Sequence, residues 1–137
     1  MKYLGLDLGS RTLGVAISDE MGILARSYDT FRFRDDDYDS AASYVVDVCN
    51  KENINTVVLG LPKHMNGDLG LRCEISFEFK KKLEDLASLN VILMDERLTT
   101  VIVDKTMISG NVRRDTRKKK KDEMAAVVIL QDYLDKK

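Results

Sequence analysis

The spacing of apolar residues along the chain predicts five strands. Residues 3–8 have β-type composition, a turn at residues 9–12 reverses the chain into residues 13–18, and a second turn leads into a long strand from residue 23 to about residue 34. These three strands are predicted to form an antiparallel meander. Residues 56–59 and 91–94 are short and mostly apolar, which is typical of parallel strands that are covered on both faces.

Helical spacing appears between these strands. Asp39 or Ser40 is predicted to cap a helix that buries Ala41, Ala42, Val45, Val48 and Cys49. Residues 69–86 fit an alternating strand as well as one helical face. A helix is predicted there because neighbouring parallel strands require a long, right-handed crossover.

Two more helices are predicted towards the C-terminus. Thr99 or Thr100 caps the first, which stops near residues 109–111, and the second covers residues 122–134. The resulting order predicts a single α/β domain over residues 1–137. Its five-stranded mixed sheet has three antiparallel strands followed by parallel ones, with helices on both faces.

The charge is distributed unevenly along the chain. Residues 1–104 carry 12 basic and 18 acidic side chains, whereas residues 105–137 carry 10 and 5, although the formal net charge is only -1. No apolar run approaches the ~20 residues of a membrane-spanning helix, which excludes a membrane protein. Asp7 interrupts the apolar stretch that a secretory signal would need, so we expect a cytoplasmic protein.

Cysteine and histidine are too scarce for a zinc site. Cys49 and Cys73 lack CxxC spacing and are predicted to be small buried side chains, and His64 is the one histidine. His64 is expected to be a loop residue or substrate contact. Carboxylates are therefore the candidate metal ligands.

Asp7 is the first such carboxylate. It lies between Leu6 and Leu8 on the strand that this architecture places centrally. Because an unpaired buried carboxylate costs several kcal/mol, positive charge is expected to face it. A structural salt bridge or a turn-capping aspartate is the alternative interpretation.

The sequence Asp95-Glu96-Arg97 directly follows the last predicted strand. It therefore emerges at the carboxyl end of the sheet, where open α/β folds bind ligands. Asp7 and Gly60 approach the same edge. The alternative interpretation is a solvated strand end with a local ion pair.

Asp122 begins the last predicted helix. At ~100° per residue it shares the core-facing stripe of that helix with Ala126, Ile129 and Tyr133. The neighbouring alanines would let the helix approach the sheet and bring Asp122 towards Asp7. A helix-capping role remains the alternative.

A strongly basic run precedes Asp122. Seven of the nine residues 113–121 are cationic. Such runs are often solvated or disordered. Beside a cluster of carboxylates, however, they favour a nuclease, because the metal must bring anionic ligands and an anionic substrate together.

Four motifs follow one another along nearly the whole chain. They are Leu6-Asp7-Leu8-Gly9-Ser10-Arg11-Thr12-Leu13-Gly14-Val15-Ala16-Ile17-Ser18-Asp19, Gly60-Leu61-Pro62 with Gly67, Asp95-Glu96-Arg97-Leu98-Thr99-Thr100, and Asp122 with Ala125-Ala126, Ile129-Leu130-Gln131 and Tyr133-Leu134. In this order and spacing they resemble the YqgF family, which is similar to a shortened RuvC-type Holliday junction resolvase and is assigned a role as pre-16S rRNA nuclease.

The resemblance implies a ribonuclease H-like fold, a bacterial cytoplasmic protein and a requirement for Mg²⁺ or Mn²⁺. Its catalytic, metal-binding acidic cluster maps onto Asp7, Glu96 and Asp122. This chain departs from the family at Lys121, where an apolar residue is usual, and this lysine could alter the charge environment of Asp122.

We therefore expect a metal-dependent endonuclease that processes the 5′ end of pre-16S rRNA in ribosome biogenesis. Its partners would be structured RNA or branched DNA, and ribosomal particles. The predicted phosphate contacts are Arg11, Arg97, Arg113, Arg114, Arg117, Lys118 and Lys119.

Three alternatives remain open from the sequence. A DNA junction resolvase would use the same metal chemistry, and a non-catalytic nucleic-acid-binding assembly factor would keep the carboxylates for structure. An ATP-binding protein of the actin or sugar-kinase type is suggested by Asp7-Leu8-Gly9-Ser10, but those folds need two such lobes.

Overall fold

The computed structural model describes residues 1–9, 11–35, 37–61, 71–95 and 114–136, with residues 71–73, 95 and 114–123 described as backbone only. The described strands form one five-stranded sheet in the order β3-β2-β1-β4-β5. Their bounds are β1 Tyr3–Leu8, β2 Thr12–Ser18, β3 Ala25–Arg32, β4 Thr56–Leu61 and β5 Asn90–Asp95. β1 pairs antiparallel with β2 and parallel with β4, so the predicted mixed sheet with β1 at its centre is confirmed.

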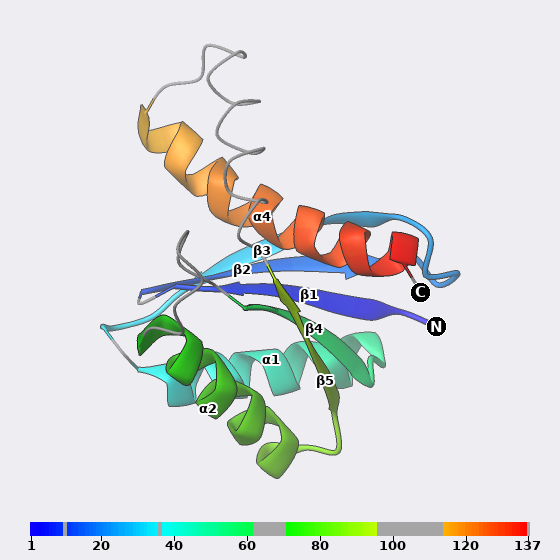
Figure 1. Cartoon of the computed structure of the whole chain (residues 1–137), viewed down its shortest axis with the longest axis horizontal. Coiled ribbons are helices and arrows are strands. Elements are labelled where there is room, and N and C mark those ends of the chain that lie inside the picture. Colours follow the sequence, from blue (N-terminus) through cyan, green and yellow to red (C-terminus); the bar gives the residue numbers. More distant parts are fainter. Residues whose placement is uncertain (10, 36, 62–70, 96–113, 137) are drawn as a thin grey trace.

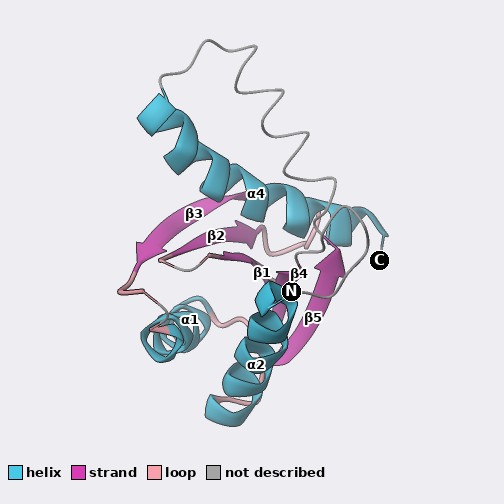
Figure 2. Cartoon of the chain, turned by 60° about the vertical axis from the view of Figure 1, so that its left-hand side comes forward, coloured by secondary structure: helices cyan, strands magenta, loops and turns pink. Residues whose placement is uncertain are grey.

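Helices cover both faces of this sheet. α1 (Tyr38–Glu52) and α2 (Leu71–Leu86) lie on one face, and α4 (Arg114–Lys136) lies on the other (Figures 1 and 2). The helical prediction for residues 69–86 is thus confirmed over the described residues Leu71–Leu86, because α2 is the crossover that returns the chain from β4 to the parallel strand β5. The helix predicted after Thr99 lies outside the described residues.

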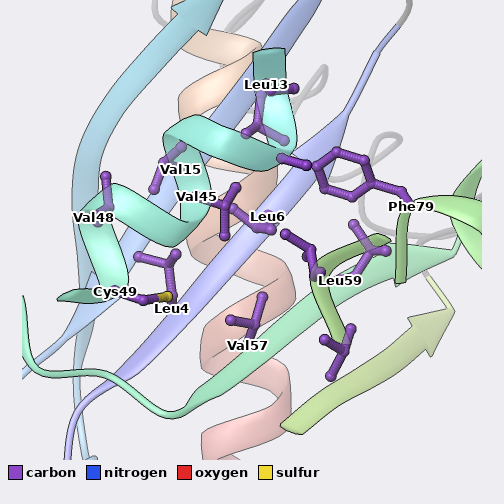
Figure 3. Close-up of a cluster of buried hydrophobic side chains, with 14 of the residues drawn as sticks. Leu4, Leu6, Leu13, Val15, Val45, Val48, Cys49, Val57, Leu59 and Phe79 are labelled. Atoms are coloured by element: carbon purple, nitrogen blue, oxygen red, sulfur yellow. The ribbon is translucent and has the colours of Figure 1, made fainter. Parts of the chain in front are cut away.

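Alternation along β1 divides the core into two layers. Leu4, Leu6 and Leu8 pack with α1 and α2 in the larger cluster, of which Figure 3 labels Leu4 and Leu6, whereas Tyr3 packs with α4 in the smaller one. Successive side chains of a strand point to opposite faces, so Gly5 and Asp7 share the α4 face with Tyr3.

The start of α1 differs from the prediction. Asp37, rather than Asp39 or Ser40, is the N-cap, and its carboxylate accepts hydrogen bonds from the Ser40 backbone N–H at 3.3 Å and the Ser40 hydroxyl at 2.8 Å. The helix ends at Asn53, whose φ of 60° is left-handed. Asparagine tolerates this conformation better than most residues.

Strand β3 is shorter than the predicted residues 23–34. The Asp19 carboxylate accepts the backbone N–H groups of Ile23 at 2.8 Å and Leu24 at 3.2 Å, which holds these two residues in the β2–β3 turn. These hydrogen bonds also lower the pKa of Asp19 from its usual value. At the far end, the Phe33 N–H donates to the Arg11 carbonyl at 2.9 Å, beyond the end of the strand.

Cys49 is buried, as predicted, and burial raises the pKa of its thiol to about 11. The side chain of Cys73 and all of His64 lie outside the described residues. In the part of the chain that the structure describes, no helix is long and apolar enough to span a bilayer.

Candidate nuclease site

The carboxyl ends of three strands meet at one edge of the sheet. Leu6 of β1 lies opposite Leu59 of β4, and Leu61 lies opposite Asp95 at the end of β5. Asp7 therefore lies at the same edge as Asp95. This is the position at which open α/β sheets bind ligands.

Glycines flank Asp7 within the sheet. Gly14 of β2 is its direct partner, and Gly60 of β4 follows Leu59, the partner of Leu6. Asp7 is only partly buried. Gly14 and Gly60 therefore add no side chains of their own beside Asp7.

Contacts along β1 establish how α4 lies over it. The rings of Tyr3 and Tyr133 meet edge to face with centroids 5.7 Å apart, and two residues further along the strand Gly5 lies under Ala126 and Leu130. The helix therefore runs opposite to β1, as Figure 1 also shows. The turns of α4 that precede Ala126 therefore extend in the direction of the β1 end that carries Asp7.

Gly5 is the position at which α4 comes closest to β1. A Cβ on Gly5 would lie 2.6 Å from the Leu130 Cβ and 3.0 Å from the Ala126 carbonyl oxygen. Ala126 is fully buried in this layer. The absence of a side chain on Gly5 and the small Ala126 together let the helix backbone approach the strand.

Gln131 anchors the same helix to the edge of the sheet. Its Oε1 accepts the Ala25 N–H at 2.8 Å, and its Nε2 donates to the Ile23 carbonyl at 2.9 Å. Gln131 thus attaches α4 to the start of β3, in addition to the contact of the helix with β1.

The start of α4 corrects two sequence interpretations. The helix begins at Arg114 rather than at residue 122, so Asp122 lies in the helix interior and cannot be its N-cap. Residues 114–121 of the basic run are helical rather than disordered. This run therefore forms the first turns of the same helix that carries Asp122.

Arg11 lies in the tight turn between β1 and β2, where the Gly9 N–H donates to the Thr12 carbonyl at 2.7 Å. Its guanidinium binds Asp35 through Nε–Oδ1 at 3.0 Å and Nη2–Oδ2 at 3.4 Å. The pair lowers the pKa of Asp35 and raises that of Arg11. Arg11 follows the end of β1 and therefore lies at the edge of the sheet that carries Asp7. The sequence pattern gave no sign that Asp35 is its partner.

The structure describes only part of the predicted site. Glu96, Arg97 and Arg113 lie outside the described residues. Asp122 is placed by its backbone alone, as are Arg114, Arg117, Lys118 and Lys119. Among the residues whose side chains are described, no three potential metal ligands form a cluster.

Comparison with solved structures defines the class of fold. RuvC of Thermus thermophilus, solved in complex with a Holliday junction substrate, superposes with a TM-score of 0.63 at 14% identity, over 98% of this chain and 94% of that one. The fowlpox virus resolvase, solved with Holliday junction DNA, gives 0.58 at 16% identity, over 99% and 98%. The fold is therefore ribonuclease H-like and similar to the RuvC-type resolvases, as predicted.

Sequence comparison then identifies the family. Residues 1–136 match the family described as "RuvX: Holliday junction resolvase". A Staphylococcus aureus (strain JH9) protein named "Putative pre-16S rRNA nuclease" is 46% identical over 135 residues, which are 98% of this chain and 95% of that protein. The chain belongs to the RuvX family, the predicted resemblance is confirmed, and the nuclease class of enzyme is supported.

Proposed function

We propose that this protein is a divalent-metal-dependent endonuclease that cleaves pre-16S rRNA in the cytoplasm. The observation that carries the proposal is the contact of β1 with α4. Tyr3 meets Tyr133 and Gly5 meets Ala126, which supports a site in which the next residue on this face, Asp7, faces the helical turn that carries Asp122. The similarity to the S. aureus relative supports pre-rRNA as the substrate.

The proposed ligands are Asp7, Asp122 and Glu96, which directly follows Asp95 in the sequence. Their donor atoms are all carboxylate oxygens, which suit Mg²⁺ or Mn²⁺ rather than zinc. Gly14, the β2 partner of Asp7, adds no side chain that would compete with such an ion. When bound, such ions activate a water molecule and neutralise charge on the scissile phosphate.

The protein itself would supply alignment and charge. Asp7 pairs with Gly14 of β2, and the preceding residue Leu6 pairs with Leu59 of β4, so strands on both sides of β1 hold this part of the backbone in place. Arg11 lies at the same edge and would contact a phosphate. The basic residues of the first turns of α4, together with Arg97 and Arg113, would contact further phosphates, which positions nucleic acid without reading its sequence.

The second candidate is a DNA junction resolvase. The RuvC and fowlpox structures favour it, because both were solved with Holliday junctions and their folds match this one over nearly the whole chain. The two candidates differ in the need for a 2′-hydroxyl, which proteins use to distinguish RNA from DNA.

Cleavage of matched substrates separates these candidates. We expect the purified protein to cut a precursor rRNA fragment that contains the 5′ end of 16S rRNA, and to leave a four-way DNA junction intact under the same conditions. Cleavage of the junction alone would establish the resolvase. Tight binding of the RNA without cleavage would instead support the non-catalytic assembly factor.

A further inference from the structure

The ion pair between Arg11 and Asp35 joins two segments at the candidate site. Arg11 belongs to the β1–β2 turn, and Asp35 lies between the end of β3 and the start of α1. Two guanidinium nitrogens face two carboxylate oxygens, at 3.0 Å and 3.4 Å. This two-point contact restrains the plane of the guanidinium as well as its position.

The backbone restrains the same pair. The Phe33 N–H donates to the Arg11 carbonyl at 2.9 Å, so the strand that leads to Asp35 is hydrogen-bonded to Arg11 itself. The Arg11 residue is therefore held at its main chain and at its side chain. Both anchors come from residues 33–35.

The pair contributes little to the stability of the fold. The side chains of Arg11 and Asp35 are 72% and 62% exposed, and water and salt screen ion pairs with such exposure. Their location at the edge that carries Asp7 suggests a role in binding instead.

A guanidinium held in this way can bind a second anion. Asp35 contacts Nε and Nη2, which form one side of the guanidinium group, and a planar guanidinium has five N–H donors in a fixed arrangement. The edge formed by Nη1 and the second Nη2 hydrogen points away from that side, and it has the geometry for a phosphate.

We propose that Asp35 is a positioning residue that orients Arg11 towards a phosphate of the bound nucleic acid. This inference rests on the proposed function, because it requires a nucleic-acid substrate at this edge. It also extends the site to the β3–α1 connection, for which neither the sequence motifs nor the charge pattern gave a signal.

A double-mutant cycle tests the proposal. Binding of a fluorescent precursor rRNA fragment would be measured in chelator, which prevents metal-dependent cleavage, for the wild type, Arg11→Ala, Asp35→Asn and the double variant. We expect Arg11→Ala to weaken binding about 10-fold and to reduce the salt slope by about one. Asp35→Asn is expected to weaken binding about 3-fold, with the double variant no weaker than Arg11→Ala alone.

Two further variants serve as controls. Asp132→Asn breaks the exposed pair with Lys136 at the far end of α4 and should leave binding unchanged. Arg11→Lys keeps the charge but lacks the planar group. In this background, the additional substitution Asp35→Asn should leave the affinity for the precursor rRNA fragment unchanged.

The outcomes separate this inference from the proposed function. Additive effects of Arg11→Ala and Asp35→Asn, or tighter binding by Asp35→Asn, would overturn the positioning role while leaving the nuclease intact. A wild-type protein that binds no nucleic acid would overturn both.

Discussion

Asp7→Asn is expected to abolish cleavage while the protein remains folded. Asparagine has nearly the same shape but cannot supply the charge that a divalent ion needs from its ligand. Even outer-shell partners of a metal ligand contribute 10- to 100-fold to activity, so loss of a ligand should cost more than about 100-fold. Single-turnover cleavage of the precursor rRNA fragment would measure this loss.

Thermal unfolding and a matched variant make the result specific. Asp7→Asn should unfold close to the wild-type temperature, because the substitution leaves the packing of β1 unchanged. Asp132→Asn, an exposed carboxylate on α4, should cleave at the wild-type rate. Full activity of Asp7→Asn would show that Asp7 is not a metal ligand.

Gly5→Ala is expected to impair both folding and cleavage. The new methyl group would lie 2.6 Å from the Leu130 Cβ and 3.0 Å from the Ala126 carbonyl oxygen, and neither is the end of a flexible side chain. Overpacking of this kind costs about 1–3 kcal/mol. Relief requires α4 to move away from β1, and a displacement of about 1 Å at a catalytic site can cost up to 100-fold in rate.

Urea unfolding and single-turnover cleavage of the same preparation test this prediction. Leu24→Ala is the control, because Leu24 is 66% exposed and its truncation removes more atoms without affecting the packing of α4. If Gly5→Ala had wild-type stability and rate, the close approach of α4 to β1 would be wrong. The proposed placement of position 122 near Asp7 would then lose its support.

The architecture was predictable because its signals are local. The β-type run at residues 3–8, the short apolar segments of β4 and β5, and the need for a crossover between them determine a mixed sheet. Helix ends were predicted less well. Several neighbouring acidic residues could each accept the N–H groups at the start of α1, so the sequence did not show that Asp37, rather than Asp39, is the N-cap.

Residue 114 as the start of α4 could not be predicted from apolar spacing. Its first turns are basic and contain few apolar residues to reveal a helical period. Lysine and arginine nevertheless have good intrinsic helix propensity, which is the signal that could have found it. The longer helix changes the interpretation of Asp122 from a possible cap to an interior position.

Parts of the site depend on tertiary contacts that leave no local signal. Asp7 stood out because a carboxylate interrupts an apolar strand. Gly5 and Asp35 did not, since their importance comes from Leu130 and Arg11, which lie 125 and 24 residues away in sequence. Only the packing of α4 on β1 and the return of the chain after β3 bring these pairs together.

Calorimetric titration of Mn²⁺ into the wild-type protein and into Asp7→Asn, paired with cleavage of the same RNA before and after chelation, tests whether Asp7 holds a catalytic metal ion. We expect the wild type to bind Mn²⁺, to lose cleavage in chelator and to regain it with added metal, and we expect Asp7→Asn to bind the ion much more weakly. Undiminished cleavage in chelator, or equal Mn²⁺ binding by the two proteins, would contradict the assignment of Asp7 as a metal ligand.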